Sequence, residues 1–186
     1  QQANLQKTNL MRANLSMANL ENAELQEVNL RGANLRGANL KEANLNNASS
    51  DGVRLESANL EGARFRNAEL ENARLTRADL SHTRFQQAVL RGATFRGAIL
   101  QDVNFTGADL RAAIFRDVEL KAVNLTRANL TRADLKGASL KDVQLQGTNL
   151  SQVDLSNVKL EEVDLAGAIY CETKMPGGAI NNSGCR

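Results

Sequence analysis

Large aromatic side chains are scarce in this sequence, which has no tryptophan, one tyrosine and five phenylalanines among 186 residues. Ordinary globular domains use such side chains to fill an irregular core. Hydrophobic residues still make up 42% of the chain, and almost all of them are leucine, alanine and valine. The length is that of one domain, but a core of so few residue types argues against an ordinary globular one.

Residues typical of catalytic sites are scarce too. The single histidine, His82, lies in the stretch SHTRF at a position that we assign below to an outward corner, so we expect an ordinary surface residue. No phosphate-binding glycine loop and no GxSxG motif occur. The acidic residues are spread along the chain, which does not by itself make an acid–base pair with a cleft. We therefore predict a protein that is not an enzyme and has no metal and no cofactor.

A strong excess of one charge is also missing. Lysine and arginine number 23, aspartate and glutamate 21, which gives a net charge of +2 at pH 7. Nucleic-acid-binding proteins usually carry a larger and clustered basic excess, so we do not expect a nucleic acid partner. No apolar run approaches the roughly 18 residues of a membrane span, and no signal peptide is visible. The chain starts at Gln1 and not at Met, which we interpret as a processed or trimmed form.

What the sequence does contain is a repeat of five residues. Every fifth position from 5 to 165, 33 in all, holds Leu or Phe, with the single exception of Ser50 in the stretch NLNNASSDGVRL. Two residues before each of these positions stands Ala, Val or Thr. The other positions are mostly polar. The repeat unit is therefore (Ala/Val)–(Asn/Asp)–(Leu/Phe)–x–x.

Neither a helix nor a long strand suits this period. Five residues turn a helix by about 500°, so the leucines would point to all sides. In a strand, successive leucines would alternate between faces. A short extended segment followed by a turn works, because the small residue and the Leu then share a face. Nine glycines occupy the second position after the Leu or Phe, and Gly52 occupies the same position after Ser50; a type II turn requires positive φ there. Charged residues stand there in other units, so we expect another turn type at some corners.

The phenylalanines favour four such units in each coil of a solenoid. Phe65, Phe85 and Phe105 are spaced by twenty residues, and so are Phe95 and Phe115. Coils of twenty residues would stack each series as a column, on two opposite sides. Coils of fifteen residues would scatter them.

Runs such as ANLRGANLKEANL and ADLKGASL resemble the pentapeptide repeat family, and the resemblance extends over residues 1–169. It implies an all-β fold, a right-handed quadrilateral β-helix of about eight coils of 20 residues with Leu/Phe and Ala/Val inside. At about 4.8 Å per coil, the rod would be about 40 Å long. Ser50 would then be a point defect in the core, because Ala48 and Val53 keep their inward positions on either side of it.

Residues 170–186 change in composition, and we predict that they form a C-terminal cap or tail. Tyr170 and Met175 are expected to cover the last coil. The stretch YCETKMPGG resembles tails of cyanobacterial and plastid members of the family. Cys171 and Cys185 could form a disulfide, worth about 3 kcal/mol by the loop-closure argument, or stay reduced. A disulfide would place the protein in an oxidising compartment, the periplasm or the thylakoid lumen, and reduced cysteines would place it in the cytoplasm.

Stacking the units in four columns brings basic residues onto two corners that flank one side. An apolar residue, Ile114, stands on that side at a position normally polar. We predict a protein-binding patch there, against the alternative of an ordinary solvated side. Its residues are Arg91, Arg96, Arg111, Ile114, Arg116 and Lys136. Two more columns, Arg54/Arg74 and Arg64/Arg84, break the Asn/Asp rule, and we expect Glu56, Glu61, Glu69 and Glu71 to neutralise them largely.

These features favour a non-enzymatic, rigid scaffold that binds another protein and does not enter membranes. One alternative comes from the resemblance: some pentapeptide repeat proteins mimic DNA and modulate DNA gyrase, although those are strongly acidic. A second alternative is an accessory interaction domain of a larger regulatory protein, because no cap precedes the first coil. The uncapped coil also leaves two states open, a monomer or an end-to-end dimer.

Overall fold

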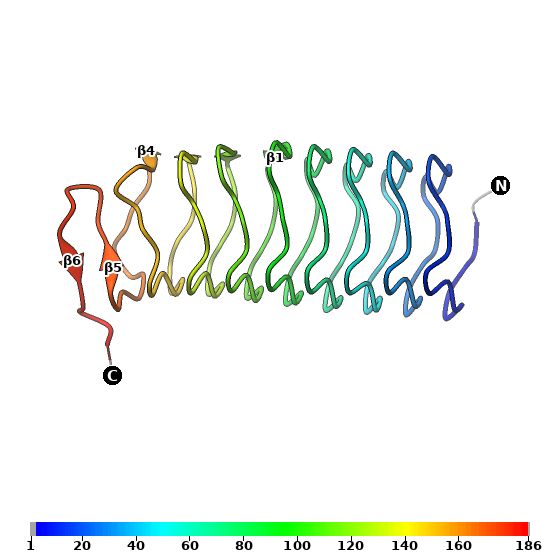
Figure 1. Cartoon of the computed structure of the whole chain (residues 1–186), viewed down its shortest axis with the longest axis horizontal. Helices are drawn as coiled ribbons and strands as arrows, with labels where there is room; N and C mark the ends of the chain where they lie inside the picture. The colour runs from blue at the N-terminus through cyan, green and yellow to red at the C-terminus, as the bar shows by residue number, and fades with distance from the viewer. Residues whose placement is uncertain (1–2, 186) are drawn as a thin grey trace.

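The computed structural model describes residues 3–185, which wind into a stack of coils along one axis with the two chain ends at opposite ends of the stack (Figure 1). Parallel β-bridges join residues twenty positions apart, from the pair Asn4 and Glu24 to the pair Asp154 and Lys174. The bridges are held by backbone hydrogen bonds such as Leu25 N to Asn44 O, 2.8 Å. Each coil therefore takes twenty residues and four repeat units, as the spacing of the phenylalanines predicted.

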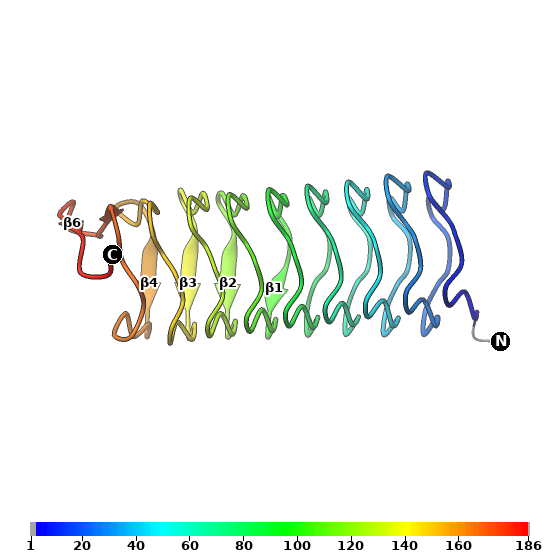
Figure 2. The same ribbon diagram turned by 90° about the horizontal axis from the view of Figure 1, so that it is seen from below.

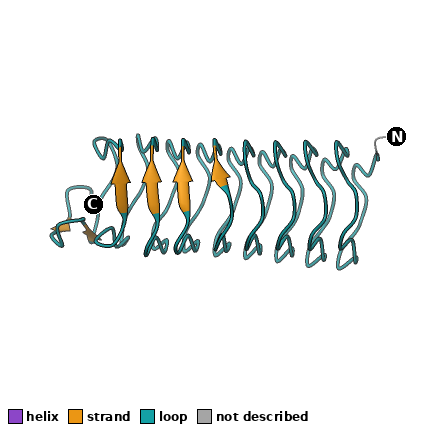
Figure 3. Ribbon diagram, turned by 90° about the horizontal axis from the view of Figure 1, so that it is seen from above, coloured by secondary structure: helices purple, strands orange, loops and turns teal. Residues whose placement is uncertain are grey.

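Within residues 3–165, continuous strands occur on one side of the stack only. Strands β1 (Leu100–Gln101), β2 (Glu119–Lys121), β3 (Ser139–Lys141) and β4 (Lys159–Glu161) form a parallel sheet in that order. They lie side by side on successive coils (Figures 2 and 3), with Leu120 paired to Leu140. On the other sides, three residues between two turns leave room for a single bridge.

Most corners are β-turns in which the amide of the small residue donates to the carbonyl of the preceding Leu or Phe, as in Ala13 N to Leu10 O at 3.0 Å. In these turns, except at Asn157, the second of the two central residues has positive φ and the first does not, which is the type II pattern. The corners that follow β1 to β4 are bends without this hydrogen bond. Arg12 and Glu27 adopt φ values of 55° and 57°, as the glycines do. A charged residue therefore does not by itself require a different turn, which corrects the reason for our expectation, although the corners after β1 to β4 do differ from the others.

The coil-to-coil hydrogen bonds explain why charged residues accept this backbone conformation. A left-handed conformation costs an ordinary residue about 1–2 kcal/mol. The same residue, however, donates its amide to the next coil, as in Arg12 N to Arg31 O at 2.9 Å. Leaving that amide unpaired, or breaking the register of the stack, would cost more free energy than the left-handed conformation does.

The interior is filled by columns of Leu and Phe, with Ala and Val between them. Phe65, Phe85 and Phe105 stack with centroid distances of 5.0 and 5.2 Å, and Phe95 stacks on Phe115 at 4.5 Å. The two stacks meet edge to face, with Phe95 and Phe105 5.9 Å apart. The predicted stacks are therefore confirmed, and the interior is narrow enough for them to touch.

Ser50 lies fully buried in the column between Leu30 and Leu70, and the backbone keeps its register there, with Ser50 N bonded to Glu69 O at 2.7 Å. Its hydroxyl has no hydrogen-bond partner within residues 3–185. Buried Thr83 and Thr148 differ, because their hydroxyls donate to a carbonyl 23 residues earlier, at 2.9 and 2.7 Å. Those threonines occupy the position of the small residue, and Ser50 occupies the position of the Leu, farther from any carbonyl it could reach.

Coil pairing continues into the segment that we interpreted as a tail. Tyr170 is buried in the position of a Leu, and its hydroxyl donates to Leu165 O. Thr173 occupies the position of a small residue and donates to Leu150 O at 2.8 Å. Met175 packs against the core. Strand β5 (Thr173–Lys174), which directly precedes Met175, pairs with β6 (Ile180–Asn181) in an antiparallel hairpin at the end of the stack (Figure 1).

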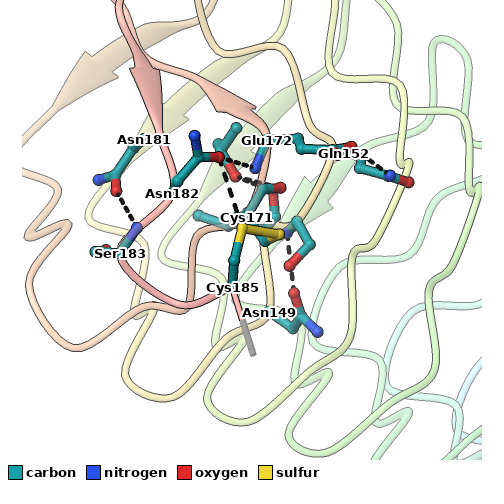
Figure 4. The surroundings of a disulfide bond; sticks show 11 residues. Asn149, Gln152, Cys171, Glu172, Asn181, Asn182, Ser183 and Cys185 are labelled. Carbon is teal, nitrogen blue, oxygen red and sulfur yellow. Dashed lines mark hydrogen bonds between the residues drawn. A yellow bond between two sulfur atoms is a disulfide. The ribbon is translucent and has the colours of Figure 1, made fainter.

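A disulfide joins Cys171, in the last coil, to Cys185 near the chain end (Figure 4). Otherwise the described residues after Met175 are held by a few hydrogen bonds, among them Gly184 N to Tyr170 O at 2.7 Å and Glu172 N to Asn182 Oδ1 at 2.8 Å. The residues from 176 to 180 are all exposed. The disulfide is therefore the main constraint on this tail.

Reducing the disulfide is expected to release the tail without unfolding the coils. The loop-closure contribution of about 3 kcal/mol would be lost, which corresponds to a rise of about a hundredfold in the open population. Limited trypsin digestion measures this as cleavage after Lys174, with and without a reductant. The arginines within the coils serve as an internal control and should resist cleavage in both samples. Equal cleavage after Lys174 in the two samples would contradict the assignment.

Candidate functional site

Arg91 and Arg111 follow one another along a corner of successive coils, and both contact the carboxylate of Asp109. Arg91 Nε lies 2.7 Å from Asp109 Oδ2, and Arg111 donates from Nε at 2.9 Å and from Nη2 at 2.7 Å. Asp109 stands on the side that precedes this corner, away from the side of Ile114. These two arginines of the predicted patch therefore lean toward Asp109.

Asp109 is ionised more readily than an ordinary aspartate. Partial burial of its carboxyl raises the pKa, but hydrogen bonds from Arg111 and Arg91 outweigh burial and lower the pKa from 3.8 to about 2. The same interaction raises the pKa of Arg111. Because the folded-state pKa is depressed, the group stabilises the fold above pH 4, and this stabilisation is lost as the pH falls toward 2.

Removing both arginines, as Arg91→Gln with Arg111→Gln, is expected to return the pKa of Asp109 from about 2 to near 3.8. The pH dependence of the free energy of unfolding between pH 2 and 4 should flatten with it. Carboxyl-carbon NMR titration of Asp109 measures the first effect directly. Arg96→Gln is the matched control, since no contact of Arg96 with Asp109 is described. A pKa near 2 in the double variant would show that the arginines are not the cause.

The other basic residues of the predicted patch lie along the next corner. Arg116 donates from Nε to Asp134 Oδ2, and Lys136 Nζ and the Arg96 guanidinium have no ion pair within the described part of the chain. Arg96, Arg116, Lys136 and Asp117 surround a hollow of about 190 Å³. We refer to Arg96, Arg116 and Lys136 as the basic corner.

Two isoleucines flank the basic corner. Ile114 is half-buried on the side that precedes it, bridged to Thr94 and Asp134. Ile99 lies on the side that follows, immediately before β1, and is 54% exposed. The structure thus divides the six residues of the predicted patch between two corners, with Ile114 on the side between them. Sequence reasoning missed Asp109 and Asp134, although both fall in the twenty-residue columns next to the arginines that they bind.

Hollows continue along the basic corner in both directions. One of about 520 Å³ shares Arg96 and Asp117 and extends to Arg77. Another of about 330 Å³ shares Lys136 and extends to Asn157. Together the three hollows form a shallow groove along one corner of the rod.

His82 is exposed on a corner, with Nδ1 3.7 Å from Asp102 Oδ2. Over residues 3–185 no group of His, Cys, Asp or Glu side chains could hold a metal ion. No helix long and apolar enough to cross a membrane is found in that same range.

The geometry defines the chain as a parallel β-helix built from five-residue units, and family comparison agrees. Pentapeptide repeats, in 8 copies, match residues 1–32, 13–49, 23–62, 51–87 and 73–111, and the pentapeptide repeat region matches residues 93–170. The chain belongs to the pentapeptide repeat family. A comparison with curated proteins gave no match.

Among solved structures, the chain is similar to HetL, a pentapeptide repeat protein involved in heterocyst differentiation regulation from the cyanobacterium Nostoc sp. strain PCC 7120. The identity is 28%, the match covers 97% of this chain and 92% of HetL, and the TM-score is 0.61. A trypsin-treated form of QnrB1, a plasmid-mediated fluoroquinolone resistance protein, matches at 20% identity over 84% of this chain and 86% of its own, with a TM-score of 0.62. These likenesses imply a right-handed β-helix.

Proposed function

We propose that this protein is a non-enzymatic, rigid, four-sided rod of about eight coils that binds another protein along the basic corner. The observation that supports this most is the groove that follows the corner from Arg77 to Asn157. A rigid wall with many hydrogen-bonded coils loses little conformational entropy when a partner binds it, and solenoids commonly present such extended surfaces.

The chemistry of the groove indicates the character of the partner. Arg96 and Lys136 offer unpaired positive charge, and Ile99 and Ile114 offer apolar contacts on either side. Arginine beside apolar area is typical of interface hot spots. We infer a partner segment that carries carboxylates along its middle and apolar side chains at its margins.

Affinity capture with charge-reversed variants tests this function. Arg96→Glu with Lys136→Glu should lose the partners that wild type captures from a lysate of the source organism, because each change adds repulsion against carboxylates. Lys121→Glu with Arg127→Glu makes the same change in net charge on other corners and should keep those partners. An equal loss in both pairs, or no loss in either, would reject the basic corner.

A DNA-mimic modulator of gyrase is the alternative that the family suggests. The likeness to QnrB1, at 20% identity, carries the fold alone. The net charge of +2 and the exposed basic corner oppose mimicry of a polyanion. A supercoiling assay with gyrase decides this alternative, and we expect no effect of the protein on the rate.

A disulfide persists in oxidising compartments, so we propose the periplasm or the thylakoid lumen as the location of the protein.

The N-terminal end of the stack supports end-to-end pairing of two chains, because its leucines are only partly buried: Leu5, Leu10 and Leu15. Light scattering of wild type against Leu10→Glu would measure such pairing, with loss of the dimer as the expected result.

A further inference from the structure

Two pairs of stacked arginines stand on different sides of the rod, and only one pair is neutralised. Arg54 and Arg74 lie in adjacent coils, and both approach Glu56, with Nε to Oε1 distances of 3.8 and 3.0 Å. Arg64 and Arg84 also lie in adjacent coils, on another side of the rod, and a backbone β-bridge joins them as it joins Arg54 and Arg74. The residue that corresponds to Glu56 beside that second pair is Arg66. The sequence thus replaces a carboxylate by a third guanidinium.

No ion pair or side-chain hydrogen bond of Arg64, Arg66 or Arg84 is found among residues 3–185. The carboxylates that we expected to neutralise this pair are engaged elsewhere: Glu61 contacts Lys41 Nζ at 2.7 Å, and Glu69 contacts Arg31 Nη2 at 2.7 Å. That part of the expectation is wrong for Glu61 and Glu69, because Lys41 and Arg31 hold these carboxylates instead.

The corner column that contains Arg66 supplies no carboxylate nearby. It runs Gln26, Asn46, Arg66, Gln86, Thr106 in successive coils. Three positive charges therefore converge without a counter-ion, which is unfavourable unless an anion joins them.

The three arginines line a hollow of about 170 Å³ together with Asn46 and Gln86. This volume lies below the range of about 300–1,000 Å³ that holds drug-sized ligands, so it suits a small ion or a single chemical group. Asn46 Oδ1 accepts from the amide of Arg66 at 2.9 Å, which leaves the Nδ2 amino group free to donate. The three guanidinium groups and the amino groups of Asn46 and Gln86 can donate hydrogen bonds in the hollow, and Gln86 Oε1 can accept one.

Arg64 shows where an acceptor is missing. Its Nε is shielded from solvent and has no hydrogen-bond partner in the described chain. Arg54 Nε is covered in the same way, but Glu56 is within 3.8 Å of it. A covered guanidinium donor without an acceptor costs free energy, so the protein itself does not satisfy Arg64 in this arrangement.

We propose that Arg64, Arg66 and Arg84 form a binding site for a phosphate group. On the side of Glu56, one carboxylate lies beside two arginines. Three arginines would need more negative charge and more acceptor oxygens than one carboxylate has. A phosphate supplies both, with a charge near −2 and three or more oxygens. Arginine forks match phosphate oxygens in bidentate geometry.

Titration with inorganic phosphate tests the site directly. Nitrogen–proton NMR of the arginine Nε groups follows Arg64, Arg66 and Arg84 in the intact protein at constant ionic strength, with chloride replacing phosphate in the reference. We expect saturable shifts of these three signals, half-complete at millimolar phosphate or below, and no such shifts with chloride. A linear drift without saturation, or equal shifts at Arg74, would overturn the proposal.

Two variants sharpen the result. Arg66→Glu copies the arrangement around Glu56 and should abolish phosphate binding while the circular dichroism spectrum and the melting temperature are maintained. Arg74→Gln removes one arginine from the other pair and should leave phosphate affinity unchanged. Arg84→Gln should weaken it about tenfold, the effect of losing one charge-assisted hydrogen bond. Unchanged affinity in Arg66→Glu would contradict the site.

The source of the phosphate group is distinguished in the same experiment. A phosphoserine peptide that binds tighter than inorganic phosphate would assign the site to a phosphorylated protein, and equal affinities would assign it to the free anion. Both outcomes support the site. The unphosphorylated peptide serves as the control and should give no shift at Arg64.

Discussion

Replacing Ser50 by leucine is expected to raise the free energy of unfolding by about 3 kcal/mol. The new side chain would complete the column between Leu30 and Leu70, in a backbone that already keeps the register of its neighbours. Burial of a leucine contributes about 1.5–3 kcal/mol, and removing an unpaired buried hydroxyl adds to this. For a chain of this length the melting temperature should rise by about 6–12 °C.

Ser50→Ala separates the two contributions. It removes the unpaired hydroxyl without filling the column, so the expected gain is about 1 kcal/mol. Ser49→Ala changes the outward neighbour and should have little effect. Calorimetry and urea unfolding of the three variants measure these values. A destabilising Ser50→Leu would show that the coil has closed around the serine and that leucine overpacks it.

Replacing Phe105 by alanine should lower the free energy of unfolding by about 4 kcal/mol, the largest single effect that we expect. Phe105 joins the two aromatic stacks. It stacks on Phe85 at 5.2 Å and meets Phe95 and Phe115 edge to face at 5.9 and 6.4 Å. The ring is fully buried, and the coils above and below are fixed by hydrogen bonds, so the cavity cannot collapse.

Phe65→Ala is the matched control for Phe105→Ala. Phe65 is equally buried but touches one phenylalanine ring, Phe85, at 5.0 Å. Each aromatic contact is worth about 0.5–1.5 kcal/mol beyond area burial, so Phe105→Ala should cost about 1–2 kcal/mol more than Phe65→Ala. Chemical unfolding of both variants measures the difference. Equal costs would show that the edge contacts between the stacks contribute nothing.

The five-residue period was sufficient to predict coils of twenty residues and stacked phenylalanines. Each unit can bury its Leu and its small residue only by turning after them, and the spacing of Phe65, Phe85 and Phe105 selects the number of units per coil. The five-residue period and the spacing of the phenylalanines favour the same coil, so these two patterns are sufficient to predict it.

The backbone at charged corners was not predictable from local preference. Glu27 and Arg12 are poor choices for positive φ when considered alone. The hydrogen bonds to adjacent coils, such as Glu27 N to Asn46 O at 3.1 Å, impose the conformation on them. A similar limit applies to the tail: Tyr170 falls on the position of a Leu or Phe, but its residue type concealed the continuation of the coil.

The pairing of surface charges was the least predictable part of the candidate site. Columns of twenty residues place Arg91, Arg111 and Asp109 near one another, yet the direction in which each side chain leans depends on rotamers that the sequence does not specify. This is why the predicted patch separates into the pair around Asp109 and the basic corner, and why Arg64 and Arg84 are left without the expected glutamates.

Site-specific photo-crosslinking tests most directly whether the basic corner binds a partner protein. A photoreactive amino acid replaces Asp117 in the basic corner or, as the control, Arg127 in the opposite corner. Both residues are exposed and occupy the same turn position, with φ of 56° and 58°. We predict a covalent adduct with a partner from the position of Asp117 and none from that of Arg127. Adducts of equal yield from both positions, or from Arg127 alone, would contradict binding along this corner.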